Sequence, residues 1–328
     1  MKREEFCRVE DALRTLPLGT FQIDDGPWAG EGERHLQART DGRVRMERCP
    51  VFPGVVAAFN TCLAEWVSLR HDAASAVLEI HYCRGGRVGW NMQDGMAIYL
   101  GAGDLTVQAM DCCADSAMTF PLGYAEGIAF VVDLDRLEAD CPDILREAGF
   151  SVETLREKFC GGMPVVIPAC QEVACIFEPL CTAPAALRRP YLQLKAQELL
   201  LYLSTLSVSG REWTRYGAQQ IALIQEIHSL LTEHLDQRFT IEELSRRYAI
   251  NSSSLKELFK AVYGLPVATY MKEYRIHRAM ELLRETDDQV SDIAAQVGYE
   301  SQGKFAQAFK DVTQTLPTAY RKWCRGGG

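Results

Sequence analysis

Residues 241–264 read IEELSRRYAINSSSLKELFKAVYG, and residues 293–321 read IAAQVGYESQGKFAQAFKDVTQTLPTAYR. The second stretch repeats the pattern of the first about fifty residues later, with one extra residue in its turn. The repeated positions are Ile241, Leu244, Ser245, Ile250, Leu255, Phe259 and Lys260, matched by Val290, Ile293, Ala294, Tyr299, Phe305, Phe309 and Lys310. An internal repeat with helical spacing of its apolar residues predicts two helix-turn-helix units.

Residues that commonly cap helices mark the ends of these elements. Thr240 and Glu243 have the spacing of a capping box, so a helix is expected to begin at residue 241. Asn251 opens the next helix as its N-cap, and Gly264 ends it. We therefore expect two recognition helices, at about 251–263 and 300–312, and a bridging helix over 267–284. If the bridge places them about one turn of B-DNA apart, roughly 34 Å, both can enter successive major-groove segments.

These residues resemble the AraC/XylS family of transcription regulators. The family pattern of the second unit is matched by Ile293-Ala294-x-x-x-Gly298-Tyr299, Phe305-x-x-x-Phe309-Lys310 and Pro317-x-x-Tyr320-Arg321. The resemblance covers about residues 240–322, a quarter of the chain, and also includes Leu244, Leu255, Phe259, Gly264, Tyr270, Arg275, Ala279, Leu283 and Arg284. Within the family the chain looks closest to regulators of the siderophore-responsive type.

The sequence departs from the family in two places. The family usually has Phe-Gly-x-Thr before the proline, whereas this chain has Thr313-Gln314-Thr315-Leu316. We therefore expect the second recognition helix to end in a different cap. Acidic residues also surround the second unit, at Glu285, Asp287, Asp288, Asp292, Glu300 and Asp311. The first unit is therefore expected to supply more of the affinity for DNA.

The resemblance implies an α+β chain of two domains, a cupin-like β-barrel with helices followed by an all-α double helix-turn-helix domain. It implies a sequence-specific regulator, more commonly an activator, that acts on promoter DNA with RNA polymerase and responds to a small-molecule effector or forms a homodimer. The helical wheel and the family pattern together give the DNA-facing residues as Ser252, Ser253, Lys256, Lys260, Ser301, Gln302, Lys304 and Gln307. The alternative for each is an ordinary solvated surface residue. A glutamine carboxamide suits an adenine edge, and a lysine suits guanine or phosphate.

The charge of the chain is divided unevenly. The net charge is −9, but residues 1–210 carry a net of −10 and residues 211–328 a net of +1. Within 244–284 the eight bases Arg246, Arg247, Lys256, Lys260, Lys272, Arg275, Arg278 and Arg284 outnumber the three acids Glu257, Glu273 and Glu281. A local excess of positive charge is what phosphate binding requires, so the acidic total does not argue against DNA binding.

The N-terminal part has the punctuation of short strands. From about residue 15 to 135 the chain breaks every eight to twelve residues at Gly, Pro or Asp-Gly, as at Gly85-Gly86. Strand-like runs lie between the breaks, at 76–82, 97–100, 105–110 and 127–132. This spacing predicts a small β-barrel or sandwich, followed by helices around 134–148 and 151–159 and a stretch interrupted by prolines.

A pocket in this barrel is the expected effector site. The candidate residues are Trp28, Arg43, Tyr82, Arg87, Trp90 and Tyr99, although core packing explains the aromatic ones equally well. A metal-binding cupin needs a His-x-His with a glutamate beyond, and His81 stands alone. We therefore interpret His81 as a structural residue and expect neither a metal nor a cofactor.

The segment 191–216 separates the expected domains, 1–190 and 217–328. Residues 191–206 carry a broad apolar helical face, which either packs against the barrel or pairs with the same helix of a second subunit. Residues 207–216 are the expected linker.

Composition limits the other classes of protein. The N-terminus shows no signal peptide and no run is long enough to span a membrane, so a cytoplasmic protein is expected. The twelve cysteines are expected to be free thiols that act as small buried hydrophobes rather than redox or metal groups. The chain lacks a Gly-x-Ser-x-Gly elbow, a phosphate loop and a paired-carboxylate pattern. Two rival interpretations stay open, a constitutive regulator whose first domain only dimerises and a cupin-type enzyme with a DNA-binding tail.

Overall fold

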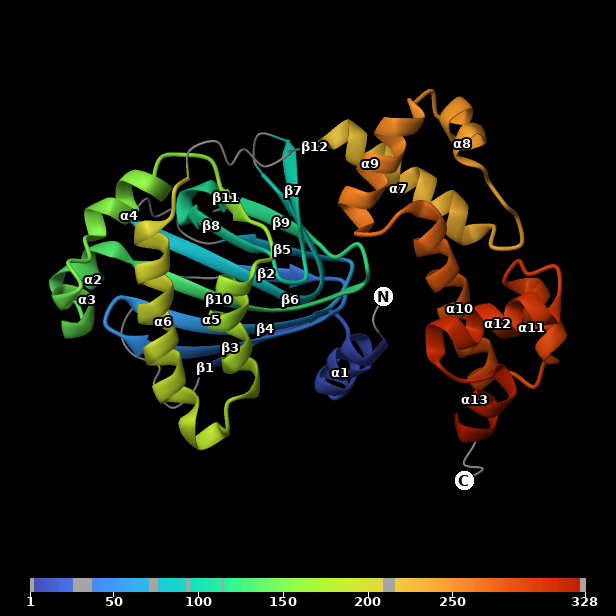
Figure 1. Cartoon of the computed structure of the whole chain (residues 1–328), viewed down its shortest axis with the longest axis horizontal. Helices are drawn as coiled ribbons and strands as arrows, with labels where there is room; N and C mark the ends of the chain where they lie inside the picture. Colours follow the sequence, from blue (N-terminus) through green and yellow to red (C-terminus); the bar gives the residue numbers. More distant parts are fainter. Residues whose placement is uncertain are drawn as a thin grey trace. The chain divides into compact units, whose positions relative to one another are not determined.

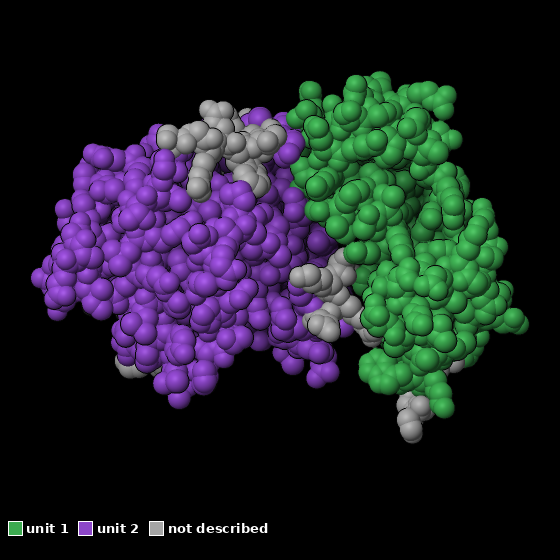
Figure 2. All heavy atoms as spheres, in the orientation of Figure 1, with its two compact units in different colours: residues 1, 218–328 green, residues 2–217 purple. Residues whose placement is uncertain are grey.

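The computed structural model describes residues 3–25, 37–70, 76–92, 95–113, 115–208 and 216–324. The chain divides into two compact units, one within residues 2–217 and one within residues 218–328 (Figure 2). No helix within the described residues is long and apolar enough to cross a membrane.

The N-terminal unit is a near-closed β-barrel with helices, as predicted (Figure 1). Its described strands are β1 (Thr20–Asp25), β2 (Gln37–Thr40), β3 (Arg43–Phe52), β4 (Val55–Leu63), β5 (Trp66–Arg70), β6 (Val77–Asn91), β7 (Met96–Gly101), β8 (Leu105–Ala109), β9 (Asp115–Thr119), β10 (Tyr124–Asp133), β11 (Val165–Ile167) and β12 (Tyr216–Gly217). They pair in the order β1-β3-β4-β10-β6-β9-β5-β2, while β7 and β8 also pair with β6. The two ends of this path, β1 and β2, lie against each other, which nearly closes the barrel.

Strand β6 is longer than the sequence predicts. Gly85-Gly86 was expected to break the strand, but β6 continues through it and changes partners there. Its first part pairs with β10 and β8, and its second part pairs with β7 and β9. Gly86 has a φ of +75°, and a Cβ at this position would lie 2.3 Å from the carbonyl oxygen of Tyr124. The glycine pair is therefore the bend by which one strand serves both walls of the barrel.

Helices cover one face of this sheet. They are α2 (Leu134–Ala139), α3 (Asp143–Glu147), α4 (Val152–Phe159), α5 (Gln171–Thr182) and α6 (Arg188–Thr205), and α1 (Arg3–Leu13) packs near β4 and β10. Helix α5 differs from the sequence prediction of a stretch interrupted by prolines, because Pro179 lies inside the helix. Helix α6 packs its buried face, Leu192, Ala196, Leu199, Leu200 and Leu203, into the core beneath the sheet.

Helix α6 therefore belongs to the N-terminal unit rather than to a separate connecting segment. The barrel and α5 cover its apolar face. Of the two interpretations that the sequence left open for this face, the structure shows packing against the barrel rather than pairing with a second subunit. Most of the expected linker, residues 209–215, lies outside the described residues.

The C-terminal unit is entirely helical from residue 218 onward. It comprises α7 (Ala218–Glu233), α8 (Ile241–Arg247), α9 (Ser252–Tyr263), α10 (Val267–Glu285), α11 (Val290–Gln296), α12 (Gln302–Thr313) and α13 (Pro317–Cys324) (Figure 1). The pairs α8–α9 and α11–α12 are the two predicted helix-turn-helix units, and α10 is the predicted bridge.

The repeat extends to the backbone conformation of the turns. Ala249 and Gly298 occupy equivalent turn positions, with φ of 50° and 79°. Gly264 and Gln314 end α9 and α12 in the same left-handed conformation, with φ of 83° and 60°. The expectation of a different cap for the second recognition helix is therefore wrong. Gln314 adopts the left-handed conformation that glycine usually provides. Its backbone N–H donates to the Lys310 carbonyl at 2.8 Å, and the Gly264 N–H donates to the Lys260 carbonyl at the same distance.

Candidate nucleic-acid interface and barrel cavity

A capping box opens the first helix-turn-helix unit, as predicted. The Thr240 backbone N–H donates to Glu243 Oε2 at 2.8 Å, and the Glu243 N–H donates to Thr240 Oγ1 at 3.2 Å. The bond from the Thr240 backbone lowers the pKa of the Glu243 carboxyl. The acid also lies at the positive end of the helix, so the start of α8 is defined by local chemistry.

Helix α9 presents most of its expected DNA-facing residues to solvent. Leu255, Leu258 and Phe259 are buried against the unit, which leaves Ser253, Lys256 and Lys260 exposed on the other face. Ser252 differs, because it is only half-exposed and its hydroxyl lies 2.9 Å from that of Ser245 on α8. Ser252 therefore ties the two helices of the unit together.

Helix α12 exposes Gln302, Lys304 and Gln307, with Phe305, Ala308 and Phe309 buried behind them. Exposed Ser301 caps the helix, since its hydroxyl accepts the Lys304 backbone N–H at 3.3 Å. The Lys304 ammonium pairs with Glu300 at 2.9 Å, and both side chains are more than half exposed. An exposed pair of this kind is weak because water screens it, so a phosphate can displace it.

Asp311 links α12 to the bridging helix. Its carboxylate accepts a hydrogen bond from Gln307 Nε2 at 2.7 Å and pairs with Lys272 Nζ on α10 at 2.9 Å. The bond from Lys272, followed by that from Gln307, lowers the pKa of Asp311. Lys272, which the sequence assigns to the base-rich stretch of the first unit, therefore offsets an acid of the second unit.

The bridging helix α10 contacts both helix-turn-helix units. Nineteen residues of α-helix are about 28 Å long. The first unit packs on the early part of α10 around Tyr270, and the second packs on its later part around Ile276 and Leu283. Both units are therefore anchored on one continuous helix, at successive parts of it.

A partly buried histidine joins the first unit to the bridge. His228 of α7 stacks on Tyr263 of α9 with ring centroids 4.3 Å apart, and its Nε2 lies 2.8 Å from the Tyr270 hydroxyl on α10. Burial lowers the pKa of His228 to about 4, so the ring is neutral at physiological pH. One neutral imidazole on α7 therefore contacts both α9 and α10 and helps to position α9.

The turn of the second unit is packed closely against the chain before α8. A Cβ on Gly298 would lie 2.0 Å from the Leu235 carbonyl oxygen. Arg275 of α10 lies beside the same turn and donates to the Gln237 carbonyl at 2.7 Å. The glycine of the family motif is thus required by both its φ and its surroundings.

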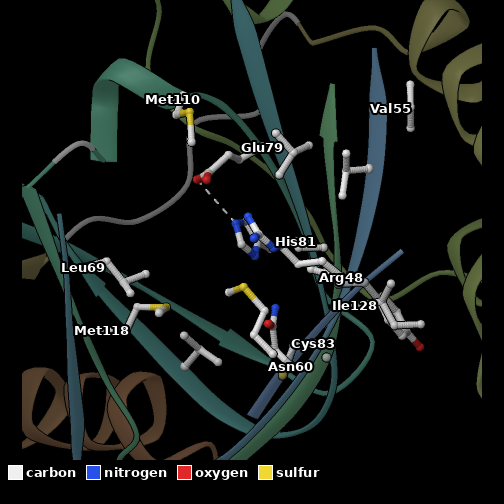
Figure 3. A pocket seen from close by; sticks show the side chains of 18 of the residues that line it. Arg48, Val55, Asn60, Leu69, Glu79, His81, Cys83, Met110, Met118 and Ile128 are labelled. Carbon is white, nitrogen blue, oxygen red and sulfur yellow. Dashed lines mark ion pairs between the residues drawn. The ribbon is translucent and has the colours of Figure 1, made fainter. Parts of the chain in front are cut away.

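The N-terminal barrel encloses a cavity of about 880 Å³. His81 and Glu79 of β6 lie at its centre, with His81 Nε2 and Glu79 Oε2 3.5 Å apart, and Asn60, Cys83, Met110 and Met118 lie around them (Figure 3). This volume falls in the usual range for sites that hold small organic molecules. Within the described residues no group of three or more His, Cys, Asp or Glu side chains could hold a metal ion.

Only part of the expected effector set lines this cavity. Trp90 does so, with its ring edge-to-face with His81 at 4.4 Å. Tyr82 reaches the lining, but its ring stacks at 4.4 Å on Phe177 of α5, on the helix-covered face of the sheet. Arg43, Arg87 and Tyr99 do not belong to the lining, and Trp28 lies outside the described residues.

The unused candidates have other surroundings. Burial lowers the pKa of Arg87, which lies beside Asp104. The ring of Tyr99 lies over Gly89 on the neighbouring strand and near Tyr216 of β12. The aromatic and basic residues were chosen by type alone, and the sheet register determines which of them face inward.

Sequence reasoning missed the polar residues at the centre of the cavity. His81 was interpreted as structural, and Asn60 and Glu79 were not considered. An alternation of small residues would have revealed them, because Ala125, Gly127 and Ala129 occupy every second position of β10, and Ala58 of β4 pairs with Ala129. Small residues at inward positions of neighbouring strands indicate a hollow barrel.

The cysteines are free thiols where the structure describes them. The ten described cysteines form no disulfide, and burial raises the pKa of Cys62 and of Cys83 to about 12. Both line the barrel cavity as neutral thiols. They act there as small apolar groups.

Comparison with known proteins assigns the C-terminal unit. A family model described as a helix-turn-helix domain matches residues 244–322. The HTH-type transcriptional activator RhaR of Mannheimia succiniciproducens is 30% identical over 126 residues, 38% of this chain and 46% of that protein. The uncharacterized HTH-type transcriptional regulator YtdP of Bacillus subtilis is 31% identical over 108 residues, 33% of this chain and 14% of that protein.

Part of the chain is also similar to a solved structure. The C-terminal domain of the two-component response regulator YesN from Fusobacterium nucleatum is 34% identical, covers 30% of this chain and 95% of that domain, and has a TM-score of 0.28. The chain spans about half or less of the length of the two curated relatives described above. The resemblance to siderophore-responsive regulators stays a prediction. The C-terminal unit of the chain is therefore similar to the helix-turn-helix domains of these transcription regulators.

Proposed function

We propose that this chain is a sequence-specific transcription regulator that reads promoter DNA with two recognition helices and responds to a small molecule held in its barrel. The observation that carries the proposal is the repeated geometry of α8–α9 and α11–α12 on one bridging helix. Two equivalent recognition helices on a rigid connector suit two successive segments of major groove.

The proposed DNA-facing residues are the exposed side chains of those helices. Lys256 and Lys260 of α9 approach phosphates, and Gln302 and Gln307 of α12 approach base edges. Ser253, Ser301 and Lys304 complete the surface, while Ser252 supports it from behind through Ser245. We infer activation from the name of the relative RhaR, an HTH-type transcriptional activator. RNA polymerase is the partner that the family resemblance implies.

A homodimer is part of the proposal. Helix α6 and the turn before it leave the large apolar side chains of Leu187, Tyr191 and Leu194 48%, 37% and 60% exposed on the outer face. Their spacing of four and three residues places them on one side of the helix. Sedimentation of the full chain and of the Leu194→Glu variant tests this pairing. If the chain is a dimer through this face, the variant sediments as a monomer. If the unmodified chain is already a monomer, the two have the same mass and the pairing is contradicted.

The test of the DNA-binding proposal is a binding titration of the full chain. Duplexes from the promoter beside the gene, and scrambled duplexes of the same composition, are titrated between 50 and 200 mM salt. Preference for the promoter, together with a steep loss of affinity as salt rises, is expected from several lysine and arginine contacts to phosphate. Equal or salt-insensitive binding to both duplexes would contradict the proposal.

A further inference from the structure

The two helix-turn-helix units meet at a second place besides the bridging helix. The core of the second unit is built by α10 to α13, around Ile276, Leu283 and Phe309. The first unit packs α7 and α9 against α10. The connection between α7 and α8, residues 234–240, also reaches the turn between α11 and α12 (Figure 1). The two units therefore contact each other directly as well as through α10.

Backbone atoms make this second contact a close one. A Cβ on Gly298 would lie 2.0 Å from the Leu235 carbonyl oxygen and 3.2 Å from Arg275 Cζ. Because a Cβ is only one bond from its Cα, the glycine backbone and the Leu235 carbonyl lie in direct contact, with no room for water between them. Glycine allows both this approach and the φ of 79° at the turn.

The guanidinium of Arg275, on α10, lies in the same junction. Its Nη2 donates to the Gln237 carbonyl oxygen at 2.7 Å. Its Cζ lies beside the Gly298 turn, and its charge interacts with Tyr299, the next residue of that turn. One side chain of the bridge thus contacts the connection that leads into the first unit and the turn of the second.

Placing a guanidinium in this junction has a cost. Burial lowers the pKa of Arg275, while the neighbouring Arg238 repels its charge and Asp236 attracts it. Its Nε is buried and has no hydrogen-bond partner within the described part of the chain. A desolvated charge needs a compensating interaction, and the bond to the Gln237 carbonyl supplies one. An apolar side chain would pack on α10 without this cost, so packing alone does not explain an arginine here.

We propose that Arg275 is a positioning residue that holds the two helix-turn-helix units as one body and thereby fixes the spacing of the DNA segments that α9 and α12 contact. The inference rests on the proposed reading of DNA by both helices and adds what sets their separation. Units that packed only on α10 could shift by small sliding or rolling motions on that helix. The junction of Leu235, Gln237 and Gly298 is a second point of contact that opposes such motions.

The first test measures the separation of α9 and α12 in the full chain without DNA. Spin labels are placed at Glu257 and Lys310, which are exposed and lie outside the proposed DNA-facing set. A non-natural amino acid carries them, because exposed cysteines of the chain would react with a thiol label. Pulsed electron paramagnetic resonance should give one narrow distance distribution for the otherwise unmodified chain and a broader one for Arg275→Ala. Arg278→Ala, an exposed change on the same helix, is the control and should leave the width unchanged.

The second test measures the spacing preference on DNA. One base pair is inserted or deleted between the two segments of the best duplex that the unmodified chain selects. The unmodified chain should lose roughly tenfold in affinity on the altered duplexes, and Arg275→Ala roughly threefold or less. This ratio of affinities comes from one preparation, so a lower folded fraction does not change it. Arg275→Lys keeps a donor for the Gln237 carbonyl and should fall between the two, and it carries both tests if circular dichroism shows that Arg275→Ala does not fold.

The outcomes separate this inference from the proposed function. If no duplex with two preferred segments is selected, the reading of DNA by two helices is wrong, and the distance measurement still tests the junction. If two segments are selected and the Arg275 variants match the unmodified chain in either measurement, the positioning role is overturned although DNA reading stands. A broad distance distribution in the chain with Arg275 intact would also overturn it.

Discussion

The side-chain amide of Gln307 donates a 2.7 Å hydrogen bond to Asp311, one turn further along the second recognition helix. Lys272 of the bridging helix holds the other oxygen of that carboxylate at 2.9 Å. Since Asp311 is anchored by the bridge, it orients the carboxamide with its oxygen free to accept. The acids around the second unit therefore do not all oppose DNA, because this one organises a residue expected to read bases.

Replacing the glutamines should change specificity more than affinity. Gln302→Ala and Gln307→Ala are each expected to cost roughly 1–3 kcal/mol on the preferred site if they make bidentate contacts, with little loss on scrambled DNA. Asp311→Ala should reproduce the Gln307 effect without adding to it in the double variant. Paired titrations on both duplexes measure this, with exposed Gln296→Ala on α11 as control. Equal losses on the two duplexes would show that these residues do not read bases.

The lysines of α9 should behave differently. Lys256→Ala and Lys260→Ala are expected to weaken binding to every sequence and to reduce the slope of log affinity against log salt by about 1 each. Both ammonium groups are exposed on the face opposite the buried Leu255 and Phe259. The measurement is a salt series on promoter and scrambled duplexes, with exposed Arg14→Ala of the N-terminal unit as control. An unchanged slope would place these lysines away from phosphate.

The turn glycine of the second unit should resist substitution. Gly298→Val places a β-branched side chain at a φ of 79° and against the Leu235 carbonyl, so a loss of about 1–3 kcal/mol of unfolding free energy is expected. Operator binding should fall more than helical content measured by circular dichroism. The matched control is Gly303→Ala in α12, where a Cβ meets nothing within 4 Å and should stabilise by about 0.5–1 kcal/mol. Normal binding by Gly298→Val would contradict the assigned turn.

Acid should destabilise the C-terminal unit through His228. Its pKa is about 4 in the folded state against 6.5 when unperturbed, so the unfolded chain binds a proton first as the pH falls. The stability contributed by the neutral ring is present above pH 6.5 and is lost between 6.5 and 4, by up to about 3 kcal/mol. Denaturant unfolding of the wild type and of His228→Phe across this range measures the difference. The exposed His234→Phe variant is the control, and parallel curves for wild type and His228→Phe would refute the mechanism.

Much of the C-terminal unit was predictable because its signals are local. Thr240 with Glu243, Asn251 and Gly264 mark helix ends through contacts with their own neighbours, and each acts as the sequence predicts. The cap at Gln314 was not predictable in this way. A glutamine rarely adopts positive φ, and the packing of the repeat imposes that conformation on it.

The barrel cavity was less predictable because it depends on register between distant strands. Trp90 and Tyr82 are both aromatic residues of β6, yet one faces His81 and the other stacks on Phe177. Gly85-Gly86 allows the strand to bend rather than end, and this bend decides which residues after it face inward. Residue type alone does not distinguish these outcomes.

The most direct test of DNA recognition by two helices is a selection of random duplexes by the full chain, followed by sequencing of the bound pool. The bridge geometry predicts two preferred segments about 10–10.5 base pairs apart, on one face of the duplex. The Lys256→Ala change in α9 should leave the base preferences of both segments intact. Gln302→Ala and Gln307→Ala should relax the base preference of only the segment that α12 contacts. A single preferred segment, or a pool without sequence preference, would contradict the claim that both recognition helices enter the major groove.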